Sequence, residues 1–288
     1  MRLQSYAIDE QGNYQWNKLL RNVKPFYLVP RNADQNAAQP EQVVVPANGQ
    51  SNDVRMTVNH EGPFEGAYLT YDAGATGVAA AQLIELEMPS VKHKITGRPC
   101  HISTVMGSGQ RYNILPESIW LQKRQGLIFR SFDLSGQENT VRPVIHGQRF
   151  WLDQARDANL DKYARERDFR NRYILPYMCP TDEDITMDAS QAATDYYFTQ
   201  DVRGHFEVFK ICVHSTDEFK FVILDENDQQ LMTNWVHVNA GMGNAQDPFV
   251  FYGTWLISAG GQCTFRLQEL SGDENKIYIT LIGRMLMV

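Results

Sequence analysis

The sequence contains none of the local patterns that usually mark an enzyme or a cofactor site. Its seven histidines never stand in H-x-x-H or H-E-x-x-H spacing, and its four cysteines form no C-x-x-C pair. No segment matches G-x-S-x-G, G-x-G-x-x-G or G-x-x-x-x-G-K-[ST]. Such motifs supply metal ligands, catalytic nucleophiles and phosphate-binding loops. We therefore predict a protein that is not an enzyme and that holds no metal and no cofactor.

Long apolar runs are also missing. No window reaches the roughly 18 to 20 uncharged apolar residues that span a bilayer, and the first residues lack the apolar stretch of a signal peptide. The cysteines lie far apart in mostly apolar surroundings, as at Cys212, which favours reduced structural thiols over a disulfide framework. We expect a soluble chain that is not secreted and has no membrane partner.

Positive charge is scarce as well. Lysine and arginine number 27 against 34 acidic residues, for a net charge of −7. An acidic chain is poorly suited to sequence-independent phosphate binding, so we expect no direct contact with nucleic acid. Hydrophobic residues make up 43% of the chain and charged residues 21%, which predicts packed cores rather than disorder.

The clearest feature that is present is an internal duplication. Residues 129–147 align without gaps on residues 265–283 at an offset of 136, with eight of 19 positions identical. Unrelated segments of average composition would share about one. The identical pairs are Phe129/Phe265, Arg130/Arg266, Leu134/Leu270, Ser135/Ser271, Gly136/Gly272, Glu138/Glu274, Asn139/Asn275 and Gly147/Gly283. The chain therefore contains one unit of roughly 140 residues, used twice.

Further matches lie upstream in both copies. Residues 43–65 match 185–207 at an offset of 142 and end in the pair Phe64/Phe206. Trp120 matches Trp255 at an offset of 135, a one-residue slip that a bulge would absorb. The glycines of 107–109 match those of 241–243 at an offset of 134. We predict that these tryptophans and phenylalanines occupy equivalent positions in two equivalent cores.

Each copy is preceded by a lead-in of helix and extended arm. Residues 153–172 combine good helix formers with five acidic and six basic side chains, which predicts a solvated linker helix, and a shorter counterpart is expected near 16–21. The arms follow at 26–30 and 176–180, at an offset of 150. We predict that the arms lie across adjacent subunits through Phe26, Tyr27, Pro30, Tyr177 and Pro180.

Within each copy the apolar residues alternate, as in Phe209-x-Ile211-x-Val213 and Ile277-x-Ile279-x-Leu281. Alternation is typical of strands with one face in a core, and turn residues recur every 8 to 15 residues. The predicted fold is all-β, with two tandem homologous antiparallel β-sandwiches, jelly-roll or immunoglobulin-like in outline. The predicted boundaries are 1–42 for the N-terminal helix and arm, 43–152 for the first sandwich, 153–184 for the linker helix and second arm, and 185–288 for the second sandwich.

The repeated Ser-Gly-x-Glu-Asn segment is the sharpest local motif. Its oxygen-bearing side chains could hold a cation, yet neither copy has the regularly spaced acidic pattern of a calcium loop. We favour a hairpin loop in which Gly136 and Gly272 adopt positive φ, while serine and Asn139 or Asn275 bond local backbone groups.

The order of these features resembles β-sandwich virion proteins that tailed bacteriophages place on their capsids or at the head-tail region. The resemblance covers roughly residues 24–152 and 173–288 and rests on an aromatic arm, a Gly-x-Phe-Glu strand, a Trp-Leu strand and the Phe-Arg-x-x-(Asp/Glu)-Leu-Ser-Gly-x-Glu-Asn segment. It implies a non-enzymatic structural role in a virion, with synthesis in the host cytoplasm.

Several roles fit that resemblance. The first hypothesis is a capsid decoration or cement protein that binds neighbouring capsid subunits and forms homo-oligomers. A tandem jelly-roll major capsid protein, or a collar, tail or baseplate component, are alternatives. From a different class, a glycan- or receptor-binding module would require exposed aromatic clusters in a cleft.

Overall fold

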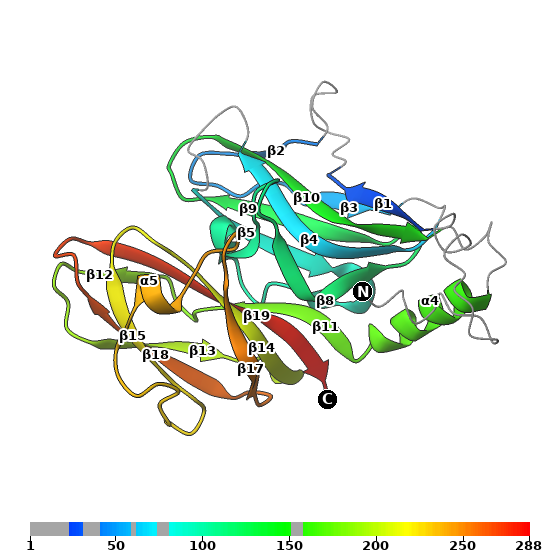
Figure 1. The fold of residues 1–288 in the computed structure, drawn as a ribbon. Coiled ribbons are helices and arrows are strands. Elements are labelled where there is room, and N and C mark those ends of the chain that lie inside the picture. Colours follow the sequence, from blue (N-terminus) through cyan, green and yellow to red (C-terminus); the bar gives the residue numbers. More distant parts are fainter. Residues whose placement is uncertain (1–22, 31–40, 59–61, 74–80, 151–157) are drawn as a thin grey trace.

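The alternating apolar pattern forms strands throughout the chain (Figure 1). The computed structural model describes residues 23–30, 41–58, 62–73, 81–150 and 158–288. Within these ranges no helix is long and apolar enough to cross a bilayer. The predicted short helix at 16–21 and the polar stretch from 31 to 40 lie outside the described residues.

The first body is a sandwich of two antiparallel sheets. Its strands are β1 (Val23–Leu28), β2 (Val43–Val45), β3 (Val54–Thr57), β4 (Phe64–Ala73), β5 (Gln82–Met88), β6 (His93–Lys94), β7 (Cys100–His101), β8 (Asn113–Leu121), β9 (Gly126–Asp133) and β10 (Asn139–Phe150). One sheet has the order β1-β10-β4-β8, with β2 also paired to β10. The other has the order β3-β9-β5-β6, with β7 also paired to β5. A 3₁₀ turn, η2 (Pro89–Val91), and a short helix, α2 (Ile102–Val105), join the later strands.

The second body repeats this plan. Its strands are β11 (Ile174–Pro180), β12 (Ile185–Met187), β13 (Thr194–Thr199), β14 (Gly204–Ser215), β15 (Phe219–Leu224), β16 (Val236–His237), β17 (Phe249–Ile257), β18 (Gln262–Glu269) and β19 (Asn275–Met287). The sheets have the orders β11-β19-β14-β17, with β12 on β19, and β13-β18-β15-β16. Helix α5 (Val238–Gly241) precedes β17, and helix α4 (Ala158–Arg170) links the two bodies.

Both bodies are jelly rolls. Strands are counted along each copy, with β1 and β2, β6 and β7, or β11 and β12 each sharing one place. One sheet then has the order first, eighth, third and sixth. The facing sheet has the order second, seventh, fourth and fifth. This arrangement of eight strands in two facing sheets is that of the jelly roll. The predicted all-β fold with two tandem antiparallel sandwiches is confirmed.

Strand register fixes which residues are equivalent in the two bodies. Strands β8, β9 and β10 correspond to β17, β18 and β19 at a constant offset of 136, because Gly66 opposes Gly147 as Val208 opposes Gly283. Strands β4 and β14 correspond at 142, and β1 and β11 at 151. In place of the slips predicted from sequence, the C-terminal half of each copy therefore has one uniform offset.

The uniform offset corrects the predicted tryptophan pair. Trp120 opposes Glu65 across the sheet, and the residue that opposes the equivalent Glu207 is Leu256, not Trp255. A shift of one residue moves a side chain to the other face of a strand. Trp120 is accordingly buried on the outer face, and Trp255 packs against the second core. Phe64 and Phe206 are fully buried and do occupy equivalent positions.

A matching bulge explains one repeated glycine. The ladder between β4 and β10 shifts register beside Gly147, and the ladder between β14 and β19 shifts beside Gly283. A Cβ at either position would lie 2.0 Å from a backbone oxygen, of Glu65 or of Glu207. Only glycine allows such close strand approach, so both copies keep it.

The residues predicted as arms are strands of the sandwiches. Strand β1 pairs along its length with β10, and β11 pairs with β19, so both lie within the sheets rather than outside them. The cause is apolar burial: Phe26 packs edge-on against Phe64 at 5.8 Å, and Tyr177 against Phe206 at 5.0 Å. The arm offset is therefore 151, which pairs Phe26 with Tyr177.

Candidate functional site

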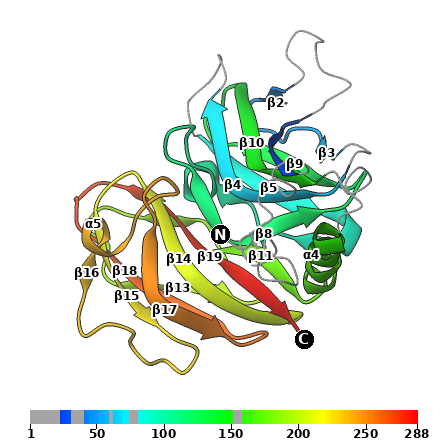
Figure 2. The same ribbon diagram turned by 45° about the vertical axis from the view of Figure 1, so that its right-hand side comes forward.

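The two bodies meet along an extensive seam. The first body contributes α2, β7 and β8, and the second contributes the outer face of β11, β19 and β14. Figure 2 shows β8 beside β11 and β19. Met178, Cys212 and Ile282 of the second body belong to the apolar core of the first. The seam therefore joins the sandwiches through a shared core.

A buried lysine crosses the seam. Lys210 on β14 donates to the side-chain oxygen of Asn113 at 3.2 Å and to the backbone oxygen of Ile114, and both Lys210 and Asn113 are buried. Burial lowers the pKa of Lys210. A buried ammonium group needs such acceptors, so this contact fixes the relative position of β8 and β14.

Backbone and hydroxyl bonds continue the seam. The backbone nitrogen of Met178 donates to Ile95 at 2.7 Å, and Gly97 donates back to Met178 at 2.8 Å. The hydroxyls of Thr104 and Thr280, both buried, lie 2.7 Å apart. These bonds pair polar groups that the contact removes from solvent.

Two histidines stack across the seam. The ring of His101 lies 4.0 Å from that of His214, nearly parallel, and 4.7 Å from that of Tyr278. Burial, and secondarily the neighbouring His214, lower the pKa of His101 to about 3. Burial also lowers the pKa of His214, so both rings are neutral at pH 7.

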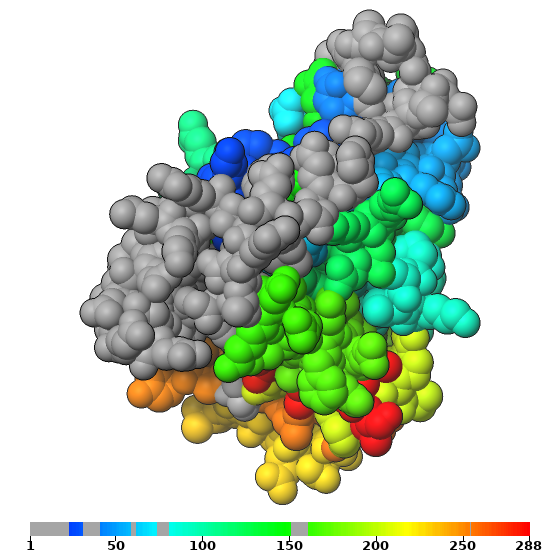
Figure 3. Space-filling model, turned by 90° about the vertical axis from the view of Figure 1, so that its right-hand side faces the viewer, coloured from blue at the N-terminus to red at the C-terminus, as the bar shows by residue number. Residues whose placement is uncertain are grey.

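Helix α4 closes one end of the seam, and Figure 3 shows its outer surface in green at the boundary between the bodies. Glu117 on β8 is almost fully buried and accepts from Arg167 at 2.9 Å and from Arg170 at 2.6 Å. Tyr163 donates to Glu65 at 2.5 Å, and Asp168 accepts from Trp120 at 2.5 Å. The helix is thus held by carboxylates of the first body.

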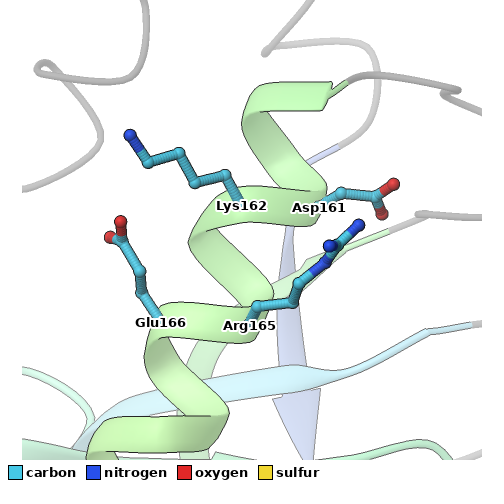
Figure 4. A pocket seen from close by; sticks show the side chains of 4 residues that line it. All are labelled: Asp161, Lys162, Arg165 and Glu166. Carbon is cyan, nitrogen blue, oxygen red and sulfur yellow. The ribbon is translucent and has the colours of Figure 1, made fainter.

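The opposite face of α4 is charged. Figure 4 shows Asp161 beside Arg165 on one side and Lys162 beside Glu166 on the other, and these residues line a shallow pocket. The spacing of four residues brings opposite charges together along a helix. This is the solvated face predicted from the sequence. On the inward face, Arg167 and Arg170 bind the helix to Glu117 of the first body.

The seam is heterologous, because each body contributes different elements. Among the described residues its two equivalent surfaces are left open, one on each body. On the second body, β17 is uncovered: Phe249 is 40% and Leu256 53% exposed, whereas their equivalents Asn113 and Trp120 are buried. Val250 and Tyr252 on the same strand are also exposed.

The open surface of the first body is the outer face of β1, β10 and β4. Tyr27 is 61% exposed and its ring meets His146 at 4.9 Å. Tyr68 is exposed and lies 4.6 Å from Tyr112, ring to ring. The two open surfaces therefore both carry aromatic and aliphatic side chains.

The predicted arm residues are divided between the surface and the interior. Tyr27 lies on the open face, Phe26 is half-buried against Phe64, and Pro30 is buried. Tyr177 and Pro180 are buried within the chain beside the seam, so they are not presented to another subunit. The same strand, β11, contributes Met178 to the seam.

The Ser-Gly-x-Glu-Asn segments form turns with the predicted glycine geometry, but their asparagines bond a side chain or a distant backbone group instead of the predicted local backbone groups. Gly136 and Gly272 have φ of 73° and 85°. Asn139 donates to the Asp133 carboxylate at 2.6 Å, and Asn275 accepts from the backbone nitrogen of Asp217 at 3.1 Å. Burial opposes ionisation, yet backbone donors led by Ser135 lower the pKa of Asp133 to about 2. Within the described ranges no group of three or more histidine, cysteine or acidic side chains could hold a metal.

The interior thiols and a cleft beside β11 offer little chemistry. All four cysteines are free and buried, and burial raises the pKa of Cys179 and Cys212 to about 12. A cleft of about 330 Å³ beside β11 contains Arg98 and Asp182, which lie 3.6 Å apart and neutralise one another.

Sequence reasoning did not find the polar residues of the seam. Glu117, Lys210 and His101 occur singly in apolar strands or at a helix end, with no motif around them. The one usable signal was the run of arginines late in the linker helix, which include the Glu117 partners.

No protein-family model matches the chain, and no curated protein matches it. Among solved structures, a chain from Sulfolobus turreted icosahedral virus is 12% identical with a TM-score of 0.42, covering 92% of this chain and 91% of that one. A chain from a structure of the triple jelly-roll fold and turret assembly in an archaeal virus is 11% identical with a TM-score of 0.22, covering 86% and 59%. PNGF-II is 9% identical with a TM-score of 0.31, covering 91% and 65%. Similarity at this level assigns neither a family nor a function.

Proposed function

We propose that this chain is a non-enzymatic structural protein of a virion, a tandem jelly-roll shell subunit whose copies assemble head to tail. Jelly rolls form the coats of many viruses and also occur in lectins and cupins. The observation that carries the proposal is the heterologous seam with its two open equivalents. A heterologous contact repeats from copy to copy and gives a ring when the rotation closes.

The open surfaces fit each other when the seam is repeated between chains. Replacing each seam residue by its equivalent converts the Asn113–Lys210 contact into Phe249 of one chain against Tyr68 of the next. The resulting pair is aromatic on both sides, and both members are exposed in the single chain. The apolar pair would gain from burial, which the single chain does not provide.

Two more pairs are complementary in the same way. The contact Thr104–Thr280 becomes Ala240 against Val144, which is apolar on both sides. The stack of His101 on His214 becomes His237 against Asp72, which brings an imidazole to a carboxylate.

One seam contact joins two residues that occupy equivalent positions in the two bodies. Arg111 pairs with Asp247 at 2.5 Å within the chain, and these residues are equivalent to each other at the uniform offset. Repeating the seam therefore places Asp247 of one chain beside Arg111 of the next. Around a closed ring the two charges would alternate, so every contact at this position is attractive.

The burial of Tyr177 and Pro180 favours this role over decoration by arms. A decoration protein of the kind expected from the sequence would hold its neighbours with both arms, and the second is part of the chain's own seam. The partners we propose are further copies of this chain, then other virion proteins on the shell.

Sedimentation of the purified protein tests the proposal. We expect the wild type to form a closed oligomer of uniform mass, and Val250→Glu with Tyr252→Glu to remain monomeric, because each places a charge on the open β17 surface. The matched control is Lys276→Glu, on an exposed position of β19 away from both open surfaces. A wild type that stays monomeric across the micromolar range would contradict head-to-tail assembly.

The exposed tyrosines favour one other candidate, a glycan-binding surface, because aromatic rings stack on sugars. Glycan-array binding by a monomeric wild type that is lost on Tyr68→Ala would support that candidate. Quantitative mass spectrometry of purified particles would separate shell from decoration, collar or tail, since a shell subunit is the most abundant virion protein.

A further inference from the structure

The first strand of each body lies at the edge of its sheet, but only one of these edges has an outer neighbour among the described residues. In the second body this edge is β11, and residues 95–97 of the first body pair with it in parallel at Met178. Met178 donates its backbone N–H to Ile95 at 2.7 Å and accepts from Gly97 at 2.8 Å. The first body therefore adds a short parallel strand to a sheet of the second, a common mode of peptide recognition.

Strand β1 presents the equivalent edge on the first body. It pairs with β10 in the register in which β11 pairs with β19, so Tyr27 occupies the position of Met178. The backbone N–H and C=O of Tyr27 therefore point away from β10, and no described group bonds either of them. Tyr27 is 61% exposed, whereas Met178 is fully buried. An edge with such unpaired groups can pair with a strand of another chain.

A matching hydrogen bond locates the counterpart of Ile95 in the second body. Ile95 donates its backbone N–H to Leu86 at 2.9 Å, and Leu231 donates to Ile223 at 2.9 Å. The two acceptors are equivalent, because each opposes the matched phenylalanine of the neighbouring strand. The three residues that begin at Leu231 therefore correspond to the three that begin at Ile95. Ile95 is fully buried, whereas Leu231 is 44% exposed.

Two differences between the copies are complementary across this contact. A Cβ at Gly97 would lie 2.4 Å from the hydroxyl oxygen of Tyr177, so glycine fits there and larger residues do not. The equivalent of Gly97 is Thr233, which has a Cβ, and the equivalent of Tyr177 is Phe26, which has no hydroxyl. The next atom, a ring carbon at 3.1 Å, would have to shift by a few tenths of an ångström. The pair of Thr233 and Phe26 therefore avoids the closest clash.

A side-chain donor is kept beside the same edge. The Nε2 atom of His93 donates to the backbone oxygen of Pro176 across the seam at 2.9 Å. At the offset of 136 the equivalent of His93 is Gln229, and the equivalent of Pro176 on β1 is Pro25. Both Gln229 and Pro25 are exposed in the single chain. The Gln229 amide can donate to a carbonyl oxygen as the imidazole does.

We propose that residues 231–233 of one chain add a short parallel strand to the outer edge of β1 in an adjacent chain. Tyr27 then donates its backbone N–H to Leu231 and accepts from Thr233. The partner is a second copy of this chain, because the equivalent groups already pair in this way within the chain. This inference rests on the head-to-tail assembly proposed above and names a backbone contact that joins the copies.

Disulfide trapping in co-expressed chains tests this pairing. Residues opposed in a parallel bridge, as Thr96 and Met178 are, lie within the range that a disulfide spans. Their equivalents are Met232 and Tyr27. A chain with Met232→Cys, co-expressed with a chain with Tyr27→Cys, should therefore give a covalent dimer under mild oxidation, and mass spectrometry of the digested peptides identifies the link. Lys276→Cys in place of Met232→Cys is the matched control and should give no such dimer.

The outcomes separate this pairing from the proposed function. A disulfide between the two unlike introduced cysteines supports the pairing, and it must join different chains because each chain has only one of them. Folded variants that form an oligomer in sedimentation but stay unlinked, or link only through like cysteines, overturn the pairing and leave head-to-tail assembly standing. A wild type that stays monomeric contradicts the proposed function, and the pairing with it.

A proline substitution provides an independent readout. Thr233→Pro removes the backbone N–H that would donate to Tyr27, whereas Thr233→Ala keeps it. Thr233 is exposed and its N–H has no partner among the described residues, so both variants should fold, as circular dichroism can check. We expect Thr233→Pro to weaken assembly about tenfold and Thr233→Ala to change it by less than about twofold. Equal effects of the two folded variants in sedimentation would contradict the pairing.

Discussion

The two jelly rolls share strand order, bulge and turn geometry, but they differ in what covers the sixth strand. Strand β8 lies beneath α4 and the second body, and its side chains include the buried Trp120 and Glu117. Strand β17 has no cover within the described chain and carries Leu256 and Gly253 at the same positions. The two copies keep the same sandwich. Their sequences differ where a surface is covered in one body and exposed in the other.

The largest expected difference between the bodies is at the tryptophan position. Trp120→Ala removes a fully buried ring and one of the two donors to Asp168, the other being Gln122, which should cost about 3 to 5 kcal/mol of unfolding free energy. Leu256→Ala on the monomer should cost at most about 0.5 kcal/mol, because the side chain is half exposed. Urea unfolding of assembly-deficient protein measures both. Similar costs would show that the two strands are equally covered.

The next difference is electrostatic. Glu117→Gln leaves Arg167 and Arg170 without their shared carboxylate, and we expect a loss of about 2 to 4 kcal/mol, discounted because Arg170 is partly exposed. The matched variant Gly253→Ala adds a methyl group with no atom within 4 Å and should change stability by less than about 0.5 kcal/mol. Thermal denaturation of the two variants provides the comparison, and a mild Glu117→Gln would refute the fastening role of α4.

A smaller expected effect concerns stability at acid pH. The pKa of His101 falls from its ordinary 6.5 to about 3 by burial, so the fold favours the neutral ring. Its contribution is complete above pH 6.5 and is lost as the pH falls from 6.5 towards 3. Melting temperatures between pH 7 and 4 should therefore decline less steeply in His101→Gln than in the wild type. Equal slopes in His101→Gln and the wild type would contradict this contribution.

Much of this architecture was predictable from the sequence because it depends on local rules. The alternation of apolar residues predicted the strands. Gly136 and Gly272 predicted the turns, because the positive φ at those positions favours glycine. The strand register that relates the two copies was harder to predict from the sequence. Matching Trp120 to Trp255 assumed that identity implies equivalence, whereas the ladder beside Gly147 and Gly283 sets the true offset.

The seam was not predictable because its residues are distant in sequence and become neighbours only through packing. Lys210 and Asn113 are 97 positions apart, and neither belongs to a motif. The arms were misjudged for a related reason: a segment beside polar residues, such as β1, can still be apolar enough at Phe26 and Leu28 to join a core.

A disulfide between the open surfaces tests the central claim most directly. The proposed repeat puts Ala240 of one chain and Val144 of the next at the positions equivalent to Thr104 and Thr280, whose hydroxyls lie 2.7 Å apart, so Ala240→Cys with Val144→Cys should form interchain disulfides under mild oxidation. The four native cysteines are buried and should not react. Head-to-tail assembly predicts a ladder of covalent multimers on non-reducing gels, ending at the mass of the native oligomer. A folded double variant that remains a single-chain band, while the wild type is oligomeric, would contradict it.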